Sequence, residues 1–225
     1  MSIIQPTSDD LQKLETDFVS NIFEVNSKFN LDSTNNTLSS NISQYTLKLR
    51  RADFVDEKAL TSFIKNTERL IRISPEYKYF VNYVKEILGL GYCTITGEIV
   101  EQTTIELHHH PFTLYDIVNG LICEQINQDI EISSFEIALA ATELHYQLKV
   151  PFVMLISSLH EKFHNGFLKI PMELVYGDYK YLLNRFRDHL TDSEYSKIIE
   201  YVSINKSNCG WEQGYKWIVD NGNNI

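Results

Sequence analysis

Cysteine is scarce in this chain, and its placement excludes the usual cysteine-built sites. Cys93, Cys123 and Cys209 are far apart and odd in number. No Cys-x-x-Cys pair is present to form a zinc knuckle, and three distant thiols imply no disulfide framework. We therefore expect small buried thiols in a reducing compartment, which points to a cytoplasmic protein.

Long apolar runs are also missing. No window approaches the roughly 18 uninterrupted apolar residues that a membrane span needs. The first residues carry no basic segment followed by an apolar run, so we expect no signal peptide and no membrane partner. The Gly-rich phosphate loops of nucleotide enzymes are absent as well.

Positive charge is in deficit. The formal net charge is −10, which argues against a protein that coats nucleic acid through a broad basic face. The charge is uneven, because residues 48–78 contain eight basic and five acidic side chains. A solvated helix face is the favoured interpretation of that stretch, and a phosphate-steering patch is the alternative.

The composition that remains is that of a globular protein of one or two domains. Hydrophobic residues make up 43% and aromatic residues 12% of the 225 positions. Asn, Ile, Lys and Tyr usage is typical of an AT-rich genome such as that of a phage. Apolar residues recur with helical periodicity in several segments. The predicted helices are 9–29, 56–73, 76–88, 112–128, 133–148, 157–165, 178–190 and 192–204.

Strand signals are fewer. Residues 92–95 and 99–107 are rich in Thr, Ile and Val around a turn at 96–98, and 150–156 is a short apolar run. Ser157 or Ser158 is expected to cap the helix that follows this run. The predicted fold class is α+β and predominantly helical.

Five of the seven histidines fall in two short clusters. His160 and His164 are four apart and share one face of a helix, so both can bind a single metal ion. A third ligand is expected from the His108–His110 run. Strand alternation puts His108 and His110 on one side and His109 on the other, although a strand end next to proline can relax that alternation.

These clusters resemble the HNH, or ββα-metal, nuclease family. Ile105-Glu-Leu-His-His matches the family's strand that ends in a histidine pair, and residues 153–166 look like its second strand and ligand-bearing helix. Residues 93–97 are similar to the short cysteine-and-glycine segment that often precedes the pair. The resemblance covers about residues 92–170.

The resemblance implies a role for each histidine. His108, His160 and His164 would bind one divalent metal ion (Mg, Mn, Zn or Ni), and His109 would be the general base. The implied activity is an endonuclease that hydrolyses phosphodiester bonds of nucleic acid, DNA in preference to RNA. His109→Ala would then spare metal binding and abolish turnover.

The sequence departs from the family in two respects. Fifty residues (110–159) separate His109 from His160, roughly twice the usual number, and they form two predicted helices. The family's middle Asn has no clear counterpart, and Asn119 and Asn127 are its candidates. Glu106 and His110 are further supporting candidates, Glu106 as a carboxylate that orients a ligand imidazole.

The resemblance also divides the chain. It implies a helical N-terminal region (1–90), an HNH-like ββα-metal core (91–172) with a helical insertion (112–148), and a helical C-terminal region (173–225). The alternative is a non-catalytic interaction protein on a degenerate or structural HNH-like fold, with a protein partner on its helical regions. A metallohydrolase of small phosphoesters is a second alternative.

Overall fold

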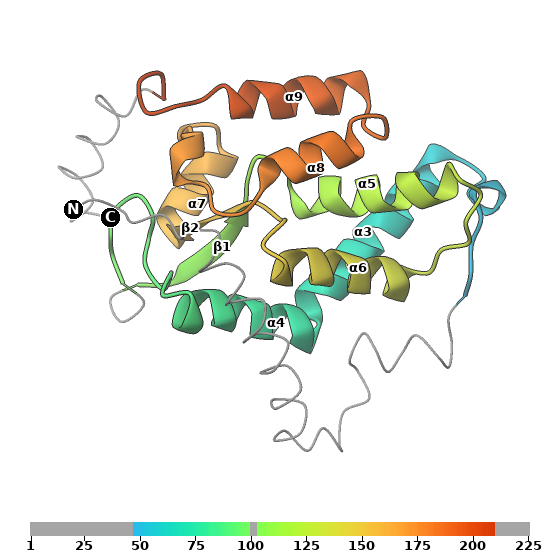
Figure 1. The fold of residues 1–225 in the computed structure, drawn as a ribbon, viewed down its shortest axis with the longest axis horizontal. Coiled ribbons are helices and arrows are strands. Elements are labelled where there is room, and N and C mark those ends of the chain that lie inside the picture. The colour runs from blue at the N-terminus through green and yellow to red at the C-terminus, as the bar shows by residue number, and fades with distance from the viewer. Residues whose placement is uncertain (1–46, 100–102, 210–225) are drawn as a thin grey trace, which may run out of the picture.

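The structure is predominantly helical with one small sheet, which confirms the predicted α+β class (Figure 1). It is a computed structural model that describes residues 47–99 and 103–209. The predicted helix at 9–29 lies outside the described residues. Within them, no helix combines the length and the apolarity that a membrane crossing requires. The predicted cytoplasmic location stays a prediction.

Two consecutive helices form the N-terminal part of the described chain. Asp56 caps α3 (Glu57–Ile73) by accepting a hydrogen bond from the amide of Ala59. Ser74 ends α3 and caps α4 (Pro75–Asn82), whose first residue is a proline. A π-helical turn, η2 (Tyr83–Ile87), continues α4. The boundary between the predicted helices 56–73 and 76–88 thus lies at Ser74.

Two apolar helices pack against α3 and against each other. These are α5 (Leu114–Ile126) and α6 (Ser134–Tyr146). Thr113 and Asp116 form a reciprocal capping box at the start of α5. Buried side chains occur all round α5, as expected of a helix enclosed by neighbours on several sides.

The sheet has two antiparallel strands that are far apart in the sequence. Strand β1 (Ile105–His109) pairs with β2 (Phe152–Ile156), so that Ile105 lies opposite Ile156. All of β2 is buried. The helices α5 and α6 occupy the connection between the two strands.

The helix α7 (Ser157–His164) begins directly where β2 ends and packs against both strands. Two further helices follow, α8 (Tyr179–Phe186) and α9 (Asp192–Val202). Thr191 and Glu194 form a capping box at the start of α9. Helix α8 packs on α5, and Figure 1 shows α9 beyond it.

One hydrophobic core runs through the described chain, from Ile64 in α3 to Ile198 in α9. It draws residues from all three predicted regions. The predicted division at 90 and 172 therefore marks changes in sequence character, and its value as a domain division stays a prediction.

Two local predictions are corrected. The segment 92–99 forms a turn closed by a single bridge between Tyr92 and Ile99, where a hairpin with a long second strand was expected. Helix α7 is preceded by Ile156 without a side-chain cap, because the hydroxyl of Ser157 donates to Glu106 instead.

Candidate metal centre

Three histidines converge where β1 meets α7. His108 comes from β1, and His160 and His164 come from one face of α7. The centroid of the His160 ring lies 4.7 Å from that of His108 and 4.7 Å from that of His164. One potential ligand atom from each residue lies within 4.8 Å of the other two. The structure thus brings together the three predicted metal ligands.

A carboxylate orients one of these imidazoles. Nδ1 of His160 donates a hydrogen bond to Oε2 of Glu106, and the hydroxyl of Ser157 donates to Oε1. These hydrogen bonds, the one from Ser157 first, lower the pKa of Glu106. With its proton on Nδ1, His160 directs the lone pair of Nε2 toward His164, whose own Nε2 is 3.0 Å away. A carboxylate behind a ligand imidazole is the usual outer shell of a metal site.

His108 is a buried imidazole with an unsatisfied nitrogen. Only 5% of the residue is exposed, and in the described part of the chain its Nε2 has no hydrogen-bond partner. Burial, and then the neighbouring histidines, lower its pKa to about 2. A buried polar atom without a partner is costly. A neutral imidazole with a free lone pair is also what metal ligation requires.

The centre is open on the α7 side. His164 is exposed and His160 is partly exposed, whereas His108 forms the buried wall. Partial burial, the neighbouring His160 and the guanidinium of Arg72 together lower the pKa of His164. Three imidazoles with one open side match the donor set of a zinc site that keeps a position for water or substrate. The residues therefore fit a divalent metal ion.

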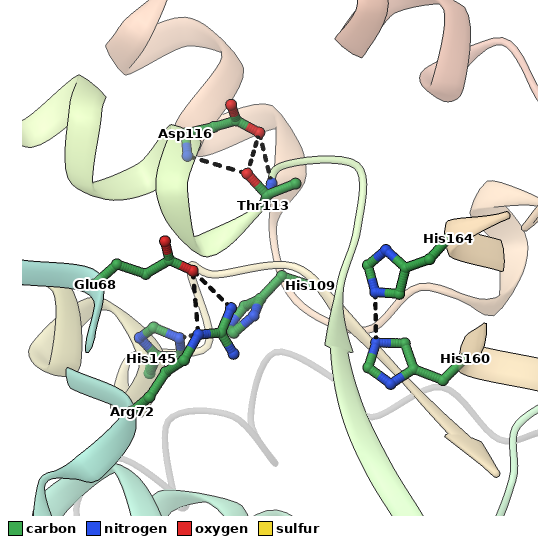
Figure 2. Close-up of polar contacts among 8 residues, drawn as sticks. All are labelled: Glu68, Arg72, His109, Thr113, Asp116, His145, His160 and His164. Carbon is green, nitrogen blue, oxygen red and sulfur yellow. Dashed lines mark hydrogen bonds and ion pairs between the residues drawn. The ribbon is translucent and has the colours of Figure 1, made fainter. Parts of the chain in front are cut away.

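His109 lies on the opposite face of β1, away from the three ligands (Figure 2). Its Nε2 is 2.8 Å from Nε2 of His145, which itself donates from Nδ1 to the carbonyl of Ala141. Tyr77 stacks over the His109 ring. Because strand alternation holds to the end of β1, the predicted general base is enclosed in the core. The geometry does not support its predicted catalytic role.

His110 is close to the centre but is not one of its ligands. It is 1% exposed, packs against Phe163 and Tyr201, and has an Nε2 without a hydrogen-bond partner among the described residues. Burial lowers its pKa to about 4. Phe163 also packs edge-on against His108. His110 thus packs with Phe163 in the buried layer behind His108.

The two asparagine candidates lie in the helical layer. Asn119, in α5, donates to Glu194 of α9 and accepts from the thiol of Cys123. Asn127 ends α5, where its side chain is 3.5 Å from both Arg51 and His189. Neither contacts the histidines of the centre, so both connect structural elements.

Two residues of this region were not among the predicted site residues. Ser157 contacts Glu106 because it directly follows the β2 residue that pairs with the start of β1. His145 is fully buried as the partner of His109. Neither contact has a local sequence signal, since both depend on pairing across more than thirty positions.

Comparison with known protein families assigns the chain to a family of phage proteins. The model of the bacteriophage G278-like virion protein family matches residues 10–216. No curated protein and no solved structure matches the chain. The family match covers most of the chain and agrees with the phage-like composition. The chain belongs to the bacteriophage G278-like virion protein family.

Proposed function

We propose that this virion protein binds one divalent metal ion through His108, His160 and His164 and hydrolyses phosphodiester bonds of nucleic acid, with DNA preferred to RNA. The observation that carries the proposal is the convergence of three imidazoles, with ligand atoms within 4.8 Å of one another. An imidazole set favours Zn²⁺ or Ni²⁺ over Mg²⁺, which prefers oxygen ligands.

The order of elements supports a nucleic-acid substrate. Strand β1, strand β2 and helix α7 follow one another in the ββα order, with one ligand at the end of β1 and two on α7. The same order and ligand positions are found in the HNH family that the sequence resembles. The helices α5 and α6 would then be an insertion between the two strands.

The roles proposed for the metal ion and for the protein's residues differ from those predicted from the sequence. A bound divalent ion would supply the activation of water and the neutralisation of phosphate charge. The protein's own residues hold and orient the ligands: Glu106 fixes the tautomer of His160, and Phe163 and His110 pack behind His108. In this proposal His109 contributes to the core, where its Nε2 is paired with Nε2 of His145.

A nicking assay on supercoiled plasmid tests the proposal. The wild-type protein is expected to nick the plasmid with Zn²⁺, Ni²⁺ or Mn²⁺ and to lose that activity in chelator. His164→Ala should abolish nicking, whereas His189→Ala, on a partly exposed histidine of the α8–α9 connection, should keep it. Equal nicking by both variants would assign the activity to a contaminant and reject the proposal.

A structural metal site is the second candidate. It is favoured by the burial of His109, which leaves the centre without the expected base, and by membership of a virion protein family. In this case the ion would only join α7 to β1. Zinc would then raise the melting temperature of the wild type, and no metal would support nicking.

A further inference from the structure

The exposed face of α3 carries a row of cationic side chains. Lys58, Lys65, Arg69 and Arg72 are separated by seven, four and three positions, which places them on one strip of a helix with 3.6 residues per turn. All four are exposed. The row extends over roughly 21 Å of helix axis at 1.5 Å per residue.

The part of the row between Lys58 and Lys65 contains no carboxylate. Ser62 occupies the position between Lys58 and Lys65, and it too is exposed. Among the described residues, the only ion pair on the row joins Arg72 to Glu68, and the Arg72 side chain is still 51% exposed. The opposite face of α3 buries Ile64 and Ile71 in the core. The row therefore has a fixed orientation toward solvent.

Two other cations of the basic stretch pair with carboxylates instead. Lys48 pairs with Glu136 at the start of α6, and Arg50 pairs with Glu131 just before it. Those pairs attach the first described residues to the helical layer. The row on α3 thus has three cations, Lys58, Lys65 and Arg69, for which the described residues provide no ion pair, in a protein whose net charge is −10.

Arg72, in the last turn of α3, forms one end of the row. Figure 2 shows Arg72 and Glu68 beside the His109–His145 pair, across β1 from His160 and His164. The far end, at Lys58, is about four turns away.

We infer that this basic row binds the phosphate backbone of nucleic acid, a choice of polyanion that rests on the proposed function. Cations on one strip of a helix suit a polyanion, whose phosphates bind by charge without base readout. A local row of cations would let a protein with a net charge of −10 bind a polyanion without a broad basic face.

Fluorescence anisotropy with a labelled 20-base-pair duplex tests the inference on the full chain, in chelator to prevent cleavage. The triple variant Lys58→Gln/Lys65→Gln/Arg69→Gln removes three cations of the row. The matched control Lys180→Gln/Arg187→Gln/Lys206→Gln removes three exposed cations elsewhere. Melting temperatures check that both variants fold. The dependence of log affinity on log salt concentration is measured for each protein.

The row variant should bind more weakly, and its salt slope should be smaller by roughly 2 to 3, about 0.9 for each lost phosphate contact. The control should retain the wild-type slope. An equal loss in both variants, absence of binding by the wild type, or equal competition by polyglutamate would overturn the inference. His164→Ala should bind DNA normally, so a failure of cleavage alone leaves the row as a binding surface.

Discussion

Glu106 and His160 are joined by a hydrogen bond between the carboxylate of β1 and Nδ1 of the imidazole on α7. The bond fixes which nitrogen of His160 is free to face His164. A carboxylate in this position also raises the basicity of the ligand imidazole. This hydrogen bond therefore connects β1 to α7 through Glu106, the residue that orients His160.

Glu106→Gln should weaken Zn²⁺ affinity by about 10- to 100-fold, the usual cost of losing an outer-shell partner. Competition with a chelating fluorophore measures this change. Glu161→Gln is the matched control, because it removes a carboxylate from the exposed side of α7 between the two ligands. Equal affinities for the two variants would show that Glu106 does not orient His160.

His109→Leu should destabilise the fold and leave the metal centre intact. The substitution keeps an apolar volume but leaves Nε2 of the fully buried His145 without its donor. An unsatisfied buried group of this kind costs about 1–3 kcal/mol of the free energy of unfolding. Urea denaturation measures that loss, and zinc titration should give an unchanged affinity. A large loss of zinc affinity at unchanged stability would place His109 in the centre after all.

The stability of the wild type should fall as the pH drops below about 6.5. Burial lowers the pKa of His145 to about 4 and also lowers that of His109. Between pH 6.5 and 4 the unfolded chain therefore binds protons that the folded chain does not, so stability is full above this window and is lost on acidification.

His145→Gln removes one of these groups and should reduce the loss between pH 7 and pH 4.5 by about 2 kcal/mol. Urea denaturation at the two pH values gives the comparison. His189→Gln, at a partly exposed histidine, should keep the wild-type loss. If His145→Gln lost as much stability on acidification as the wild type, the core pair would not be the acid-sensitive group.

Gly120→Ala should destabilise the contact between α5 and α8. A Cβ at this position would lie 2.6 Å from ring atoms of Phe186, which is fully buried. Alanine is favoured over glycine in a helix by about 1 kcal/mol, but overpacking a rigid core costs about 1–3 kcal/mol. We expect the overpacking cost to exceed the gain in helix propensity, because the buried ring of Phe186 has no room to move.

A double-mutant cycle on urea denaturation checks this account. Gly120→Ala should cost less in a Phe186→Leu background, where the smaller side chain leaves space for the added methyl group. The same cost in both backgrounds would mean that the destabilisation does not come from contact with Phe186.

Much of the helical architecture could be predicted from local signals. The helices α3, α4 and α9 begin at residues whose caps are readable from the sequence: Asp56, Ser74 and Thr191. Each of these signals acts over three or four residues. The pairing of β1 with β2 was not readable in this way, because the two strands are separated by helices α5 and α6.

The centre itself was predictable in part. The spacing of His160 and His164 fixes their common face, and strand alternation correctly places His108 with them and His109 apart. The family resemblance led instead to His109 as a base at the centre. His109 instead pairs with His145 in the core, and this partner lies 36 positions later in the sequence.

The central claim is that three histidines bind one divalent ion, and calorimetric titration of the metal-free protein with Zn²⁺ tests it most directly. The wild type and His189→Ala should each bind one ion per chain, and His160→Ala/His164→Ala should lose that binding while remaining folded. A wild type that binds no zinc, or a double variant that binds it as tightly as the wild type, would contradict the claim.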